Sequence, residues 1–385
     1  MRTLKWAIVL LLVLFLAALS YRVVSRKYYV WLPGYAHWLT HQERAKTQPI
    51  HIFFLYADHF EPGQRFDLME RWLKEYPKMA ERHRDSNGRR LQHTWFYPAE
   101  QPIDRNLLAL RKLVAAGYGE TELHLHHFHD TPASARRRFE EGISYFQRFG
   151  FLKGVDGHTH FAFVHGNWSL DNSLGDAYCG NSQELRMLKE LGCFADFTFP
   201  SLWEHSQPAW VNNIYDVTDD DRPKSYDQGV PIAVGWHPSG DLVLVQGPLL
   251  ILPSINPAKL FFSVVDGDIH PGVPVTPQRV DAWVRANIHV AGRPDWVLIK
   301  VHGHAGSSTA DLEETIGPDF DNALTYLEKH YNDGRQYLLH YVTARETYNL
   351  IRAGADGKQG DPQQYYNLVT PPYEADVTPV VRGGS

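Results

Sequence analysis

The chain has 385 residues, enough for one large domain such as a single α/β barrel. Its apolar content of 43% and charged content of 21% are those of a folded globular protein. The net charge of −6 argues against a generally basic surface and therefore against nucleic acid as a partner. The 21 histidines allow metal chemistry, and the 11 tryptophans and 20 tyrosines suit stacking against sugar rings.

Cysteine usage does not identify the cellular compartment. The chain has two cysteines, Cys179 and Cys193, whose spacing is not that of a CxxC zinc or redox motif. A single disulfide and two buried free thiols both remain open.

Residues 1–27 are predicted to be an N-terminal membrane anchor or signal segment. The run 6–20 contains no charged residue, and basic residues flank it on both sides. The segment 17–20 is a poor signal-peptidase site, which favours an uncleaved anchor. We expect a membrane-anchored protein whose folded domain lies on the periplasmic or extracellular side.

Beyond a juxtamembrane connector at 28–49, buried apolar runs alternate with amphipathic stretches. In chain order, the predicted elements are a strand at 51–57, a helix at 66–84, a strand at 94–97, a helix at 104–116, a strand at 122–126, a helix at 132–149, a strand at 161–165, a helix at 182–191, a strand at 194–199, one or two strands at 241–252, a helix at 277–290, a strand at 296–301, a mostly helical stretch at 311–331, a strand at 336–342 and a helix at 344–353.

This alternation predicts βαβ units, a parallel sheet and the α/β class. Seven to eight such units favour a barrel over an open sheet, and we assign this domain to residues 50–354. The polar segment at 204–240 is rich in Asp, Pro and Gly and is predicted to be an insertion, either a long loop or a small β-rich excursion. Residues 355–385 are expected to form an extended C-terminal tail.

Metal-competent residues follow several predicted strands. Asp58 and His59 follow the first strand, the cluster 124–129 follows the third, and His302 and His304 follow a late one. Because the carboxyl ends of parallel strands meet at one mouth, we expect these side chains to converge.

The histidine cluster predicts a metal site. His124 and His126 share a strand face, whereas His127 points to the other face unless the strand has already ended. Two imidazoles and a carboxylate from a neighbouring strand leave a coordination position open, as catalytic zinc requires. Asp58 is the candidate carboxylate, as a ligand or as a general base. The alternative is a polar strand end with ordinary hydrogen bonds.

Two further groups complete the candidate site. His302 or His304 could protonate a leaving group. After the strand at 161–165, Trp168 could form an aromatic wall for a sugar, and neighbouring polar side chains could bind its hydroxyl groups; the same string could instead form turns. The candidate substrate-binding residues are Asn167, Trp168, Asp171 and Asn172.

These motifs resemble the polysaccharide deacetylase-like members of the glycoside hydrolase/deacetylase superfamily. The resemblance covers about residues 50–350 and is carried by Asp58-His59, Glu122-Leu-His124-Leu-His126, Gly166-Asn167-Trp168 and Leu298-Ile-Lys-Val-His302. It implies a distorted (β/α)7 barrel and a divalent metal, usually zinc, which activates water to remove an acetyl group from a sugar.

The chain departs from that family at two points. The usual Asp pair is Asp58-His59, which leaves open which residue binds metal and which acts as base. Phe128 stands where the second histidine of a His-x-x-x-His motif would be, so His126, His127 or His129 could replace it.

The leading hypothesis is a deacetylase of an envelope or extracellular polysaccharide. Its candidate metal ligands are Asp58, His59, His124, His126 and His127, and its candidate catalytic residues are Asp58, His302 and His304. One alternative is a metal-independent glycoside hydrolase that pairs Asp58 with Asp171 or Glu61. Another is a non-catalytic glycan-binding protein on the same barrel.

Overall fold

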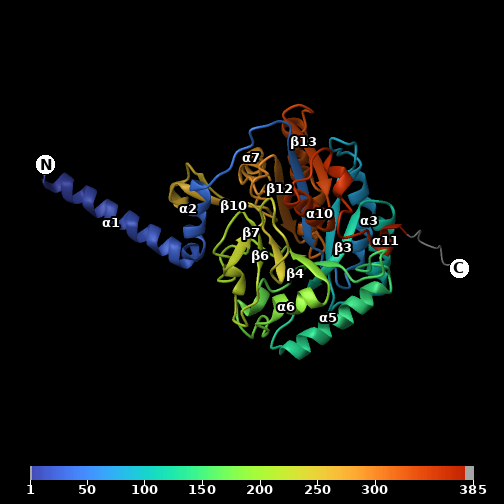
Figure 1. Cartoon of the computed structure of the whole chain (residues 1–385). Helices are drawn as coiled ribbons and strands as arrows, with labels where there is room; N and C mark the ends of the chain where they lie inside the picture. Colours follow the sequence, from blue (N-terminus) through green and yellow to red (C-terminus); the bar gives the residue numbers. More distant parts are fainter. Residues whose placement is uncertain (1, 378–385) are drawn as a thin grey trace.

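The computed structural model describes residues 2–377 and shows a mixed α/β domain from which one long helix projects (Figure 1). This helix, α1 (Arg2–Ser25), is the one described helix that is long and apolar enough to cross a membrane. Its side chains are not buried by the rest of the protein. Length and composition fit a membrane anchor and a signal sequence equally.

The connector after α1 is folded onto the domain. It forms a 3-10 turn and the short helix α2 (Leu32–Thr40), and the aromatic side chains of Tyr28, Trp31 and Tyr35 are buried. These side chains pack beside a two-stranded antiparallel sheet of β9 (Leu249–Pro253) and β10 (Phe262–Asp266). The junction is therefore a packed structure and not a free linker.

The described chain forms an 11-stranded sheet in the order β11-β12-β1-β2-β3-β4-β5-β8-β6-β7, with β13 also paired to β1. Neighbouring strands are parallel except where β6 pairs with β7 and β8. The strands are β1 (Ile50–His59), β2 (His93–Pro98), β3 (Gly119–Leu125), β4 (Phe161–His165), β5 (Cys193–Asp196), β6 (Ile214–Val217), β7 (Gly229–Pro231), β8 (Leu242–Val245), β11 (Asp268–Ile269), β12 (Trp296–Gly303) and β13 (Tyr337–Val342).

The sheet is a curled half-barrel. Within residues 2–377 its edge strands β11 and β7 do not pair with each other, so the barrel is not closed. The expected (β/α)7 arrangement is therefore not confirmed, although the mixed α/β class is as expected.

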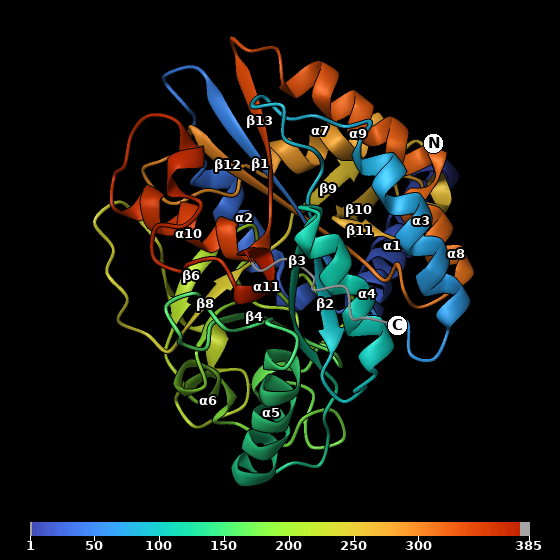
Figure 2. The ribbon, with the colours of Figure 1, turned by 90° about the vertical axis from the view of Figure 1, so that its right-hand side faces the viewer.

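Amphipathic helices cover the outer face of the sheet, and α10 packs on the inner face (Figure 2). Alternation along β1 explains this, since Phe54 and Tyr56 belong to the outer core, whereas Leu55 and Ala57 pack in the inner core with α10. The main helices are α3 (Phe66–Ala80), α4 (Asp104–Ala115), α5 (Pro132–Gln147), α6 (Glu184–Glu190), α7 (Pro277–Arg285), α8 (Thr309–Ile316), α9 (Pro318–Tyr331) and α10 (Ala344–Ala355).

The last part of the described chain differs from the extended tail expected for 355–385. Residues up to Val377 fold back onto the domain and include the short helix α11 (Glu374–Val377). Tyr373 is fully buried, and its hydroxyl donates a 2.7 Å hydrogen bond to Glu122 Oε1. Burial of Tyr373 outweighs the Pro-rich and Gly-rich composition that suggested a free tail. The remainder of the predicted tail lies outside the described residues.

Candidate metal centre at the strand ends

Asp58 and His59 lie on opposite faces of β1. The Asp58 carboxylate is fully buried on the outer side, where it accepts hydrogen bonds from His93 Nε2 at 3.0 Å and Ala305 N at 2.9 Å. The His59 ring is 4.9 Å, centroid to centroid, from the rings of both His124 and His304. Strand alternation thus directs His59 into the mouth of the curled sheet and Asp58 away from it.

Glu61 lies at the centre of this mouth, two residues beyond the end of β1. Its Oε1 atom is 3.0 Å from His124 Nε2 and 3.7 Å from His126 Nε2. Glu61 belongs to two groups whose ligand atoms lie within 4.8 Å of one another, one with His59 and His304 and one with His124 and His126. We call these five residues the mouth cluster.

Buried imidazole nitrogens in the mouth cluster lack partners. His59 Nδ1 and His124 Nδ1 make no hydrogen bond within residues 2–377, whereas His124 Nε2 has the Glu61 carboxylate as its neighbour at 3.0 Å. Burial lowers the pKa of His59 and of His124, so both rings are neutral near pH 7. Neutral imidazoles with free lone pairs, aimed at a carboxylate, are the donor set that a divalent metal such as zinc requires.

The Glu61 carboxylate supplies the negative charge. Burial alone would raise the pKa of Glu61, but the neighbouring imidazoles of His124, His126 and His304 bring it down to about 2. Glu100 Oε1 lies 2.6 Å from His126 Nδ1, which leaves His126 Nε2 directed toward Glu61. A carboxylate behind a ligating histidine is the usual way to orient such a ring for metal binding.

Trp168 stacks on the mouth cluster. Its ring lies 4.8 Å from the ring of His59, with an angle of 17° between the planes, and 5.6 Å from the ring of His302. The Trp168 backbone has a φ of 57°, a left-handed conformation that is uncommon for a bulky residue and often found at functional sites. The half-buried Trp168 therefore forms one wall of the mouth.

The two late histidines separate. His304 joins the mouth cluster, whereas His302 lies next to it with Nε2 3.7 Å from Asp268 Oδ1. Burial, reinforced by Lys300, lowers the pKa of His302 well below its usual range. Burial and the nearby Asp266 raise the pKa of Asp268 to about 6. His302 is therefore a neutral, buried group beside the mouth.

The other candidate substrate-binding side chains are engaged in the loop that follows β4. The Asn167 side chain donates to the carbonyl oxygens of His127 and Tyr178. The Asp171 carboxylate accepts from Ser225 N at 2.7 Å, and burial raises its pKa to about 9. In the same loop, Asn172 Oδ1 accepts a hydrogen bond from Gly180 N. These contacts match the turn interpretation that the sequence left open.

His127 is separated from the mouth cluster, and His129 is exposed. His127 lies between Glu184, at 2.9 Å from its Nε2 atom, and Asp130, at 3.2 Å from its Nδ1 atom. Burial would lower the pKa of His127, but these two carboxylates raise it to about 9. The structure therefore brings His59, His124, His126 and His304 together, and it places Asp58 and His127 elsewhere.

Sequence reasoning missed two groups. Glu61 was considered as a partner of Asp58 in a glycoside hydrolase and not as a metal ligand, because it lies beyond the predicted strand and its position depends on the path of the loop. Asp268 was missed because it lies on the two-residue strand β11, which has no sequence signal. The place of Glu61 two residues after His59 is the one sequence signal that could have indicated its position.

No protein-family model matches the chain, and no curated protein sequence matches it significantly. Among solved structures, the chain is similar to the Xyl-CE4 domain of a multidomain xylanase from the hindgut metagenome of Trinervitermes trinervoides. The match covers 78% of this chain and 90% of that chain, at 12% sequence identity and a TM-score of 0.30. At this level of similarity, the residues of the site are the basis for any functional assignment.

Proposed function

We propose that this protein is a membrane-anchored, metal-dependent hydrolase that removes acetyl groups from an envelope or extracellular polysaccharide. The observation that carries the proposal is the mouth cluster, in which the buried rings of His59 and His124 leave nitrogens without hydrogen-bond partners and four imidazoles gather around the Glu61 carboxylate. Burying unsatisfied nitrogens costs free energy, so their presence together favours a bound cation.

The proposed ligands come from the two overlapping groups that share Glu61. His59 and His304 would hold the cation from one side, and His124 and His126 from the other. A divalent cation at this place supplies Lewis-acid polarisation of a substrate carbonyl and lowers the pKa of water toward neutrality.

Other residues would bind the substrate and move protons. The partly exposed ring of Trp168 offers an apolar face to a sugar, which suits a polysaccharide chain lying across the mouth. His302 is our candidate for proton transfer, because it is neutral, its Nδ1 atom has no partner within the described chain, and Asp268 lies beside it. We no longer assign the base role to Asp58, since both its oxygens are bonded on the outer face.

The test is metal content and acetate release, measured on the full-length protein in detergent. His124→Ala is expected to lose metal from the mouth and to release no acetate from acetylated glycan oligomers. The matched control is His129→Asn in the same histidine-rich segment, because His129 is exposed, has a φ of 52° and should not affect either measurement.

Two outcomes would overturn the proposal. One is wild-type protein that takes up no divalent metal after reconstitution. The other is His124→Ala with the acetate release of the wild type. Glycan cleavage without acetate release would move the assignment to a glycoside hydrolase.

A further inference from the structure

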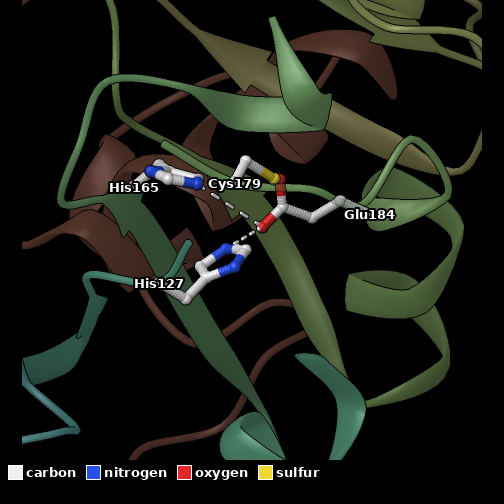
Figure 3. A group of neighbouring side chains, drawn as sticks. All are labelled: His127, His165, Cys179 and Glu184. Carbon is white, nitrogen blue, oxygen red and sulfur yellow. Dashed lines mark hydrogen bonds and ion pairs between the residues drawn. The ribbon is translucent and has the colours of Figure 1, made fainter. Parts of the chain in front are cut away.

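We propose a second metal site, a structural zinc site formed by His127, His165, Cys179 and Glu184, independent of the proposed function (Figure 3). The four residues come from four places in the chain. His127 follows β3, His165 ends β4, Cys179 lies in the next loop, and Glu184 begins α6. We call them the buried cluster.

The geometry of the buried cluster fits one ion. Its four ligand atoms all lie within 4.8 Å of one another. Glu184 Oε1 is 2.9 Å from His127 Nε2 and 3.9 Å from His165 Nε2, and Glu184 Oε2 is 3.6 Å from Cys179 Sγ. All four side chains are buried, so water has little access to compete for the ion.

His165 gives an independent indication of a missing partner. Its Nε2 atom is buried, points toward the Glu184 carboxylate and makes no hydrogen bond within residues 2–377 (Figure 3). A distance of 3.9 Å is too long for a hydrogen bond. A buried polar atom of this kind needs an explanation, and a cation between His165 and Glu184 provides one.

The surroundings also fit metal ligation. Asp130 Oδ2 lies 3.2 Å from His127 Nδ1, and Asp130 is itself held by Ser134 and Arg138. Carboxylate–histidine–zinc arrangements of this form are common in zinc proteins. At the sulfur, Asn181 N donates to Cys179 Sγ at 3.5 Å. Burial and the Glu184 carboxylate raise the pKa of the Cys179 thiol, so a cation would bind by displacing the thiol proton.

Ligation by His165 requires one local change. His165 Nδ1 now accepts hydrogen bonds from Asn167 N at 3.2 Å and Ser169 N at 3.4 Å. Binding through Nε2 places the ring proton on Nδ1, where it would face these two amides. Metal uptake should therefore shift the turn from Gly166 to Ser169.

Charge and ligand number favour a closed zinc site. The thiolate and the carboxylate together would neutralise a divalent cation. His127, whose pKa is raised to about 9 by Glu184 and Asp130, would release a proton on binding and then ligate as a neutral imidazole, as His165 would. Four protein ligands complete a tetrahedral shell and leave no position for water, which is typical of structural sites and not of catalytic ones.

Cobalt substitution tests this site separately from the mouth cluster. The full-length protein in detergent is stripped of metal, titrated with Co²⁺ and followed by absorption spectroscopy. We expect a thiolate-to-cobalt charge-transfer band, because the buried cluster contains a cysteine and the mouth cluster contains none. Cys179→Ser should lose this band.

Matched controls keep the result clear. Cys193→Ser removes the other buried free cysteine, and His124→Ala disrupts the mouth cluster, so both should keep the band. Cobalt uptake by wild type without a thiolate band, or no uptake at all, would overturn the buried site whether or not Cys179→Ser folds. Loss of the band in Cys193→Ser but not in Cys179→Ser would also overturn it. Acetate release is not used here, so failure of the proposed function leaves this result unaffected.

Discussion

The mouth cluster and the buried cluster both draw histidines from the segment that ends β3, yet they lie in different environments. His126 contributes to the first and His127 to the second, although they are consecutive residues. In the mouth cluster, Glu61 and His126 are partly exposed, whereas the buried cluster is closed to solvent. The comparison teaches that a dense histidine motif can serve two sites, because the chain direction at a strand end separates neighbouring side chains.

The largest effect on stability is expected when the buried cluster loses the Glu184 carboxylate. Glu184→Gln removes the charge beside His127 and should lower the free energy of unfolding by about 3–5 kcal/mol, as breaking a buried ion pair does. Chemical denaturation measures this loss. Acetate release per folded molecule should stay close to that of the wild type. Loss of acetate release without loss of stability would show that the two clusters do not act independently.

The matching change in the mouth cluster should reduce acetate release and leave the stability of the fold almost unchanged. Glu61→Gln removes the carboxylate shared by both ligand groups and should lower kcat/KM for acetate release at least about 100-fold, since even outer partners of metal ligands are worth 10–100-fold. Its unfolding midpoint in denaturant should change little because Glu61 is partly exposed. Full activity of Glu61→Gln would contradict the placement of the metal.

Asp58→Asn tests whether the outer face of β1 takes part in the chemistry. Asn keeps an acceptor for Ala305 N but weakens the contact with His93, so we expect a stability loss of about 2 kcal/mol. Activity per folded molecule should fall far less than in His59→Ala. Equal losses of activity in Asp58→Asn and His59→Ala would show that Asp58 takes part in the reaction.

Glu100→Gln probes the residue behind His126. The His126 ring loses its charged partner at 2.6 Å, and we expect an approximately tenfold weaker metal affinity in the mouth. Competition with a chelator measures this change. The cobalt–thiolate band of the buried cluster should be the same as in the wild type.

The smallest effect concerns a histidine outside both clusters. His83 lies between Asp321 and Glu328, as His127 lies between Asp130 and Glu184, but no cysteine or second histidine of residues 2–377 completes a metal site there. Burial would lower the pKa of His83, but its two carboxylate partners raise it overall.

Because the folded pKa of His83 is raised, its stabilisation is present below the unfolded pKa and disappears as pH rises through the folded value. His83→Gln should cost about 1 kcal/mol near pH 5.5 and much less near pH 9. Denaturant titrations at the two pH values measure the difference. A chelator should not alter it, and a chelator-sensitive difference would show that paired carboxylates alone can hold metal here.

Much of the fold followed from periodicity. The strand predicted at 161–165 has those bounds as β4, and the long amphipathic helices lie where they were expected. The strands β10 and β11 were missed because they are short or half-buried, so that no hydrophobic pattern marks them. The barrel predicted from the number of βα units is not confirmed, since the sheet is an open half-barrel, and no sequence pattern indicated that α10 packs on its inner face.

The candidate site was partly predictable. His59, His124, His126 and His304 were named from their positions at strand ends, and they meet in the structure. β3 ends at Leu125, one residue earlier than predicted, and His127 nevertheless lies apart from His126, as strand alternation predicts. The residues that His127 meets could not be predicted, because Cys179 and Glu184 come from elements far away in the chain.

The packed junction after α1 limits where the domain can work. Arg22 bonds to the carbonyl oxygens of Lys259 and Phe262, and Lys27 forms an ion pair with Glu204. With α1 in a bilayer, the mouth cluster would keep a fixed height and tilt above the lipid surface. The proposed hydrolase would then act on polymer close to the membrane, and a flexible spacer inserted after Ser25 would widen its range.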